Sequence, residues 1–191
     1  MENFQEKLNR VLAEGISIVP YKSQWATLFE KEKQHLLKCT PTGIIKRIEH
    51  FGSTSILNLA AKPIVDILGE VTSLEKTKQE IVPILEAQGY DYFWRALKGD
   101  DVPPFYAWFI KRDFKGNRTH HIHMVEKDSE LWDNLLFRDY LIKKPVLFKE
   151  YQRLKLRLAE EFSTNRVAYT EAKSGFIERI TEVAKRYYSR N

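Results

Sequence analysis

Residues 50–67, HFGSTSILNLAAKPIVDI, carry more polar chemistry than a core segment usually does. Gly52 is followed by three hydroxyl residues, and the four form a predicted turn that opens a short helix. Unpaired backbone N–H groups and hydroxyls at such a turn can hold a phosphate, because positive charge gathers at a helix N-terminus. Ser and Thr are also common helix caps, so the turn by itself equally fits a structural role.

Asp66 favours the functional interpretation of this turn. Its carboxylate lies within the apolar strand sequence IVDIL, where an ionised group is costly unless it is paired, hydrogen-bonded or bound to a metal. Strand alternation places Asp66 on one face with Leu68 and Glu70. Glu70 lies about 13 Å further along an extended strand, so Asp66 and Glu70 cannot share one metal ion. We therefore expect Asp66 to pair with the Gly-Ser turn on the preceding strand.

Three of the five histidines fall within the sequence RTHHIH, which ends at His123. Alternation points His121 and His123 to one face of a strand and His120 to the other. Two imidazoles whose Cα atoms are roughly 6 to 7 Å apart can share a metal ion. Protonated, they can bind a phosphate, and near neutral pH they can act as general acid and base. The polar face of an ordinary strand would place them in the same way.

The composition predicts one globular domain over residues 1–191. The chain is 43% hydrophobic and carries 31 basic and 26 acidic residues, so its net charge of +5 mildly favours anionic ligands. A nucleotide or another phosphate-bearing small molecule fits this charge as well as RNA does. Binding of nucleic acid has no further support, because no basic run is interleaved with aromatic residues.

Several classes of protein are excluded by the same composition. Cys39 is the only cysteine, so the chain can form neither an internal disulfide nor a cysteine-ligated zinc site. No apolar run approaches the roughly 20 residues that a membrane span requires. The N-terminal sequence MENFQEKLNRVL lacks a signal-peptide core, and we therefore predict a cytoplasmic protein without a membrane segment.

Helical and extended patterns alternate along the first two thirds of the chain. We predict a helix over residues 23–37 with Ser23 as its cap, and a strand over 44–51. A short helix from the turn to Leu59 precedes a strand over 64–71. A helix over 74–88 is capped by Thr72 or Ser73 and ends at Gly89. Residues 106–111 and 118–125 form a predicted hairpin, and helices follow over 129–144, 145–162 and 169–188.

Four motifs, GSTS, AAKPIVDI, RTHHIH and LLFRDYL, follow one another in this order. In this respect the sequence resembles the GrpB family, which is placed among the polymerase-beta-like nucleotidyltransferases, and the resemblance covers residues 18–180. It implies an α+β or α/β fold with a nucleotidyltransferase-type mixed β-sheet flanked by helices, and a helical C-terminal part. In that superfamily a Gly-Ser turn grips the phosphates of a nucleotide, and an Asp-x-Asp pair on the next strand holds divalent metal.

The resemblance assigns Gly52 and Ser53 to the turn and Asp66 to the first carboxylate, but Leu68 stands where the second should be. Two-metal phosphoryl transfer needs several oxygen ligands. Either other residues complete the site, or the protein binds a nucleotide without transferring it. We expect His121 and His123 to complete one mixed site with Asp66.

The predicted function is metal-dependent nucleotidyl transfer, and the alternative is a non-catalytic module that senses a nucleotide or binds a partner. The predicted catalytic residues and ligands for Mg²⁺ or Mn²⁺ are Asp66, His121 and His123. The predicted nucleotide-binding residues are Gly52, Ser53, Thr54, Lys62 and Arg118. We expect three further residues to support the ligand-binding side chains without touching the ligand: Arg138, Tyr169 and Lys173. Trp94 and Arg95 precede a turn at Gly99, Asp100 and Asp101, a segment that we expect to be mobile and to cover the cleft.

Overall fold

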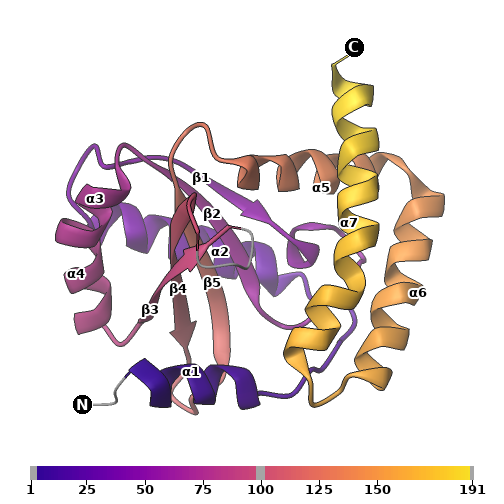
Figure 1. Ribbon diagram of the computed structural model, residues 1–191, viewed down its shortest axis with the longest axis horizontal. Coiled ribbons are helices and arrows are strands. Elements are labelled where there is room, and N and C mark those ends of the chain that lie inside the picture. Colours follow the sequence, from indigo (N-terminus) through magenta and orange to yellow (C-terminus); the bar gives the residue numbers. More distant parts are fainter. Residues whose placement is uncertain (1–3, 98–101, 190–191) are drawn as a thin grey trace. The chain divides into compact units, whose positions relative to one another are not determined.

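The computed structural model describes residues 4–97 and 102–189 (Figure 1). The turn predicted at Gly99, Asp100 and Asp101 lies outside the described residues. The chain divides into two compact units. The sheet unit comprises Lys22–Ser55 and Ile64–Trp132, and the helical unit comprises Met1–Tyr21, Ile56–Pro63 and Asp133–Asn191. The single domain over residues 1–191 stays a prediction.

Five strands form one mixed sheet in the order β1-β2-β5-β4-β3. Their bounds are β1 Ile45–Phe51, β2 Val65–Val71, β3 Asp91–Ala96, β4 Phe105–Arg112 and β5 Arg118–Val125. Strands β2 and β5 run parallel, and every other neighbouring pair is antiparallel. The predicted mixed sheet is therefore confirmed, although β3 was not among the predicted strands.

The predicted hairpin is confirmed as β4 and β5. The turn between them is closed by Asp113, whose carboxylate accepts hydrogen bonds from the backbone N–H groups of Lys115 and Asn117, both at 2.9 Å. Gly116 adopts a φ of +82°, a conformation that glycine reaches without steric cost. This local chemistry sets the register that pairs Trp108 with His123 across the hairpin.

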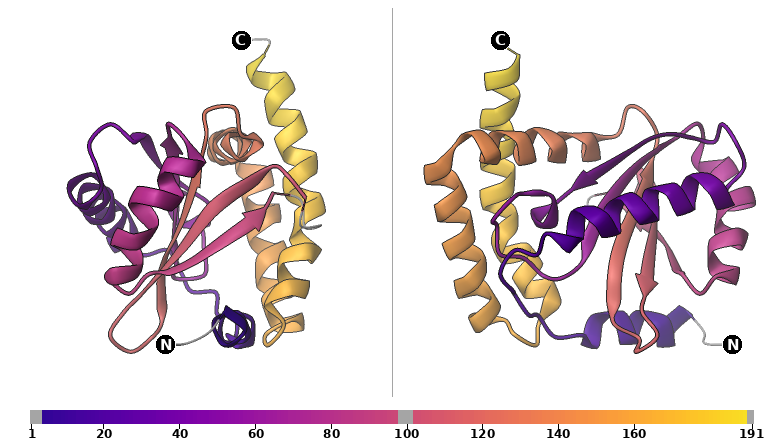
Figure 2. Two further views of the ribbon diagram at one scale, coloured as in Figure 1. Left: turned by 60° about the vertical axis from the view of Figure 1, so that its left-hand side comes forward. Right: turned by 180° about the vertical axis from the view of Figure 1, so that it is seen from behind.

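Helix α2, Gln24–Cys39, covers one face of the sheet (Figure 2). Trp25 and Leu36 are each 1% exposed, and the ring of Phe29 stacks on that of His50 at 4.8 Å. The same helix buries Glu32, which accepts hydrogen bonds from Lys111 and from the hydroxyl of Tyr90. A buried carboxylate is tolerated because both partners donate to it.

A second helical segment follows β2 in three parts. It consists of α3 Leu74–Lys76, the π-helix η2 Thr77–Ile81 and α4 Val82–Ala87. The backbone N–H of Lys76 donates to the side chain of Ser73, which confirms the Ser73 cap, and Gly89 follows the helix with a φ of +84°. Pro83 has no N–H to donate, and the wider π turn ends two residues before it.

The helical unit contains α1 Phe4–Ala13, α5 Asp133–Lys143, α6 Pro145–Glu161 and α7 Arg166–Tyr188 (Figure 1). Its core consists of Ile56, Leu59, Phe137, Tyr140, Leu141, Tyr151, Ile180 and Ala184. The helical C-terminal part is thereby confirmed. Within residues 4–97 and 102–189, no helix is long and apolar enough to cross a membrane.

Two local predictions were wrong. The short helix expected to reach Leu59 is a single 3₁₀ turn, Ser53–Ser55, and the chain then bends through Asn58 with a φ of +64°. Ser23 stands before α2, but its side chain makes no capping hydrogen bond, because its backbone is already helical at φ −57° and ψ −26°. Helix α1 was not among the predicted elements.

Candidate functional site

Asp66 and the Gly-Ser turn meet because β1 and β2 are antiparallel neighbours. Phe51 pairs with Asp66, so Gly52 follows at the end of β1 beside the carboxylate. A Cβ atom placed on Gly52 would lie 2.5 Å from Asp66 Oδ2, far inside van der Waals contact. Gly52 also has a φ of +69°. Glycine is therefore required here both by the backbone conformation and by the close approach of Asp66.

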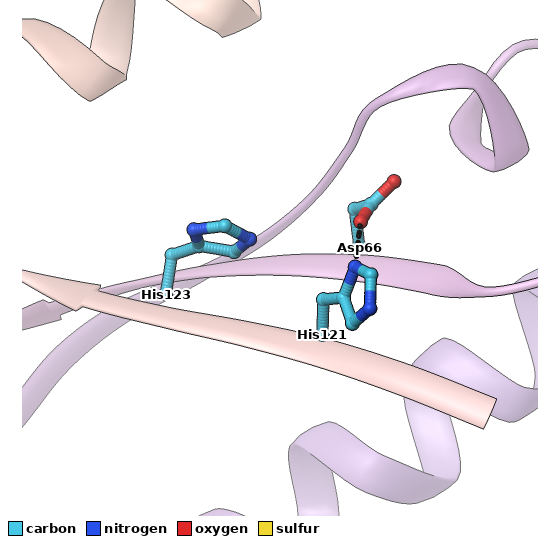
Figure 3. A group of neighbouring side chains, drawn as sticks. All are labelled: Asp66, His121 and His123. Atoms are coloured by element: carbon cyan, nitrogen blue, oxygen red, sulfur yellow. Dashed lines mark hydrogen bonds and ion pairs between the residues drawn. The ribbon is translucent and has the colours of Figure 1, made fainter. Parts of the chain in front are cut away.

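Asp66 and His121 are cross-strand partners on the parallel strands β2 and β5. The Nδ1 atom of His121 lies 3.2 Å from Asp66 Oδ1, and Figure 3 shows the two side chains facing each other. His123 stands two residues further along β5 on the same face, opposite Leu68. One donor atom from each of Asp66, His121 and His123 lies within 4.8 Å of the other two. The structure thus brings the three residues of the predicted mixed site together.

Aromatic side chains surround His123. Tyr106 stacks on its ring at 5.4 Å with an interplanar angle of 18°, and Phe51 meets it edge-on at 5.3 Å. Desolvation lowers the pKa of His123 to about 3, although the nearby Asp66 carboxylate acts in the opposite direction. The ring is therefore neutral near pH 7. Its Nδ1 atom is buried and has no hydrogen-bond partner among the described residues.

Arg118 lies on the far side of His121. It is 6% exposed, and its NH1 atom is 3.5 Å from His121 Nε2. A guanidinium can only donate, so the contact favours a His121 tautomer that carries its proton on Nδ1 and presents that proton to Asp66. A chain of contacts then runs from Arg118 through His121 to Asp66.

The other residues predicted in the turn differ in what their side chains do. The hydroxyl of Thr54 is buried and lies 3.0 Å from His50 Nε2, so Thr54 has a structural partner on the α2 side. Ser55 donates its hydroxyl to the carbonyl oxygen of Gly52 at 2.6 Å, which stabilises the 3₁₀ turn. Ser53 is partly exposed. The nucleotide contacts of Ser53 and Thr54 stay predictions.

The remaining predicted residues belong to the helical unit. Lys62 Nζ lies 5.4 Å and Lys173 Nζ 5.8 Å from the centre of the Tyr169 ring, so the structure brings these three together. Tyr169 is 1% exposed, and burial raises the pKa of its hydroxyl. Arg138 pairs with Asp139 at 2.7 Å. The parts that these four residues play toward a ligand stay predictions.

Sequence reasoning missed the aromatic residues beside His123. Tyr106 and Trp108 alternate along β4, and Trp108 contacts both imidazoles, with ring centres 5.2 Å from His121 and 6.2 Å from His123. Arg95 of β3 lies over the Trp108 ring at 4.9 Å. The sequence predicts that Tyr106 and Trp108 share one face of β4. It does not predict which residues of β5 lie opposite them.

The model of the GrpB protein family matches residues 15–183. The UPF0157 protein YqkA of Bacillus subtilis is 39% identical over 90% of this chain, which spans 48% of that relative. The glutamate-rich protein GrpB of Alkalihalophilus pseudofirmus is 35% identical over 86% of this chain and 93% of its own length. The crystal structure of conserved protein GrpB from Enterococcus faecalis has a TM-score of 0.77 and 32% identity, over 90% of this chain and 99% of that one.

Proposed function

The chain belongs to the GrpB protein family, and we propose that it binds a nucleotide at the Gly52 and Ser53 turn and transfers the nucleotidyl group. The observation that carries this proposal is the approach of Asp66 to the turn, where no side chain larger than that of glycine fits. The Asp66 carboxylate thus lies directly beside the turn, where a phosphate bound by the turn would meet it.

The proposed roles follow from charge and position. The backbone N–H groups and the Ser53 hydroxyl hold the phosphates, and Arg118 balances their negative charge. Asp66, His121 and His123 form the polar centre that faces the reacting phosphate. The hydroxyl oxygen of an acceptor attacks the α-phosphorus and forms the new ester bond, and the hydroxyl proton passes to solvent. The bond between the α-phosphorus and pyrophosphate breaks, and pyrophosphate leaves with the electron pair of that bond.

A pair of Mg²⁺ ions does not fit these residues. Mg²⁺ prefers oxygen ligands in octahedral geometry, and two-metal transfer uses several carboxylates. Here Asp66 is accompanied by two imidazoles, and Leu68, which stands at the position of the second carboxylate, is fully buried. We therefore assign no step of the transfer to Mg²⁺.

The alternative function is nucleotide sensing without transfer, and Leu68 is the observation that favours it. Pyrophosphate release distinguishes the two functions when the protein is incubated with a panel of nucleoside triphosphates, acceptors and divalent metals. Transfer predicts release that depends on Asp66, whereas sensing predicts binding without release. Absence of nucleotide binding in calorimetry would reject both.

Replacement of Asp66 tests whether its carboxylate is required for nucleotidyl transfer. Asp66→Asn keeps the shape of the side chain and removes its charge, so we expect pyrophosphate release to be abolished while the circular dichroism spectrum is unchanged. Asp128→Asn, on the exposed loop after β5, is the matched control and should retain full release. Undiminished release by Asp66→Asn would show that the chemistry belongs to other residues.

Replacement of Ser53 tests the phosphate contact. Ser53→Ala removes one charge-assisted hydrogen bond, so nucleotide affinity should fall by about 1.5–3 kcal/mol, or roughly 10- to 150-fold. Ser163→Ala, at an exposed position just after α6, is the matched control and should leave nucleotide affinity unchanged. Equal affinities of wild type and Ser53→Ala would mean that the Ser53 hydroxyl is structural.

A further inference from the structure

We propose that Asp66, His121 and His123 bind one divalent transition-metal ion of the zinc class, with selection against Mg²⁺. The inference rests on the proposed function only for the location of the site and deepens it by naming the metal. Among the described residues, these three are the one group of histidines and acidic residues whose donor atoms lie close enough together to share an ion.

The chemical type of the three ligand atoms determines which metal ion the site prefers. One carboxylate oxygen and two imidazole nitrogens match the ligands that Zn²⁺ takes in sites with an open coordination position. Imidazole suits Zn²⁺, Co²⁺ and Fe²⁺, whereas Mg²⁺ keeps to oxygen ligands and water. Leu68, on β2 two residues beyond Asp66 and opposite His123, leaves no second carboxylate to change this balance.

The distances agree with binding to one ion. Two ligands that are each about 2.1 Å from a common metal are separated by roughly 3.0–3.4 Å. His121 Nδ1 and Asp66 Oδ1 are 3.2 Å apart, so these two atoms already have the spacing of neighbouring ligands. All three donor atoms lie within 4.8 Å of one another, so a shift of the His123 ring by up to about 1.4 Å would bring the widest separation to about 3.4 Å.

The sheet holds these three side chains on one face before any ion arrives. Asp66 and His121 are paired across parallel strands, and His123 projects from the same face of β5. In Figure 3 the His123 ring presents one of its nitrogens toward the Asp66 and His121 pair. The stacked Tyr106 ring limits the rotation of His123. Ligands fixed on neighbouring strands lose little freedom when they bind a metal.

One coordination position of the ion stays open to a ligand from outside the protein. His121 binds the ion through Nδ1, which moves its proton to Nε2 and ends the contact with Arg118 NH1. The Arg118 guanidinium then lies beside an ion with an open position. An anionic oxygen of a ligand can occupy that position and meet Arg118 at the same time.

Metal titration tests the proposal without any measurement of activity. The chelator-treated protein is titrated with Zn²⁺, Co²⁺, Mn²⁺ and Mg²⁺ in a calorimeter, and the visible spectrum of the Co²⁺ form is recorded. We expect one ion per chain, with Zn²⁺ and Co²⁺ bound at least 100-fold more tightly than Mg²⁺, and Co²⁺ absorption bands of a low-symmetry nitrogen and oxygen site. Mg²⁺ binding as tight as Zn²⁺ binding, or no Zn²⁺ binding, would overturn the proposal.

Variants locate the ion. His121→Gln and His123→Gln should each weaken Zn²⁺ binding at least tenfold and alter the Co²⁺ spectrum. His35→Gln is the matched control, because His35 lies on α2 and contacts Gln88. Two separate ligand variants guard against a folding defect in either one. Zn²⁺ affinity that is unchanged in both would refute the assignment.

Metal binding and nucleotide binding can be tested separately. ATP, GTP, CTP and UTP are each titrated into the protein in the presence of a chelator and, separately, in the presence of Zn²⁺. Nucleotide binding without any Zn²⁺ binding refutes the metal and leaves the nucleotide function standing. Zn²⁺ binding without binding of ATP, GTP, CTP or UTP under either condition supports the metal and refutes the nucleotide.

Discussion

At the scale of single residues, Gly52 is the position where the geometry of the site most directly determines the residue type. Two effects oppose any side chain there: the φ of +69°, and the contact of 2.5 Å that a Cβ atom would make with Asp66 Oδ2. Asp66 Cβ and Cγ would also lie 3.1 Å away, so rotation of the carboxylate alone does not relieve the contact.

Gly52→Ala should therefore destabilise the protein more than an alanine at an open glycine with similar φ. Gly116 has a φ of +82°, and a Cβ there meets nothing within 4 Å, so Gly116→Ala measures the backbone cost alone, about 1–2 kcal/mol. We expect Gly52→Ala to lose at least about 1 kcal/mol more in urea unfolding, because Asp66 must move. Equal losses of unfolding free energy in the two variants would mean that Asp66 moves away from the new Cβ atom at no cost.

At the scale of elements, helix α6 anchors the segment Ile56–Pro63. Lys155 is 2% exposed, donates to the carbonyl oxygen of Ala60 and lies 4.9 Å from the Tyr151 ring. Gln152, one turn earlier, accepts from the backbone N–H of Ala60 at 3.0 Å. The two side chains satisfy both backbone groups of a residue that has no helix or strand partner of its own.

Lys155→Ala should consequently cost at least about 1.5 kcal/mol, since it leaves a half-buried carbonyl without its charged donor and opens a cavity. The matched control is Arg157→Ala on the exposed side of α6, which should change the free energy of unfolding by less than about 0.5 kcal/mol. Thermal unfolding of both variants provides the comparison. A loss for Lys155→Ala no larger than that for Arg157→Ala would show that α6 does not anchor the segment in this way.

At the scale of the whole molecule, we expect stability to fall in alkali. Desolvation, together with Glu86 and Glu75, raises the pKa of Tyr92 to about 12, and desolvation and Glu32 raise that of Tyr90. The unfolded chain loses these phenolic protons near pH 10, whereas the folded chain keeps them. The folded state then binds more protons, so its stability decreases as the pH rises from about 10 toward 12.

Tyr92→Phe removes one of these two groups. The difference in the free energy of unfolding between pH 9 and pH 11 should be smaller for this variant than for the wild type. Both are measured by urea unfolding at the two pH values. Phe114→Leu, at an exposed position in the turn after β4, removes no titratable group, serves as the control and should keep the wild-type dependence. A Tyr92→Phe variant with an unchanged pH dependence would contradict the assignment.

The sequence by itself determined much of the local structure. Strand alternation predicted that Asp66 and Leu68 share one face of β2 and that His121 and His123 share one face of β5, and both strands are present where expected. The Ser73 cap, the helix end at Gly89 and the hairpin over residues 106–111 and 118–125 were predicted because their chemistry acts within a few residues. Helix spacing predicted α5 and α6 for the same reason.

Tertiary structure alone decided which faces meet. Nothing in the sequence of β2 specifies that its partner is β5 or that the pair is parallel, yet this pairing sets Asp66 opposite His121. Strand β3 forms at the far edge of the sheet on β4, and the hydroxyl of Thr54 is held by His50. Strand order, register and buried partners depend on contacts between distant residues, and their free energy is gained only when the whole sheet has assembled.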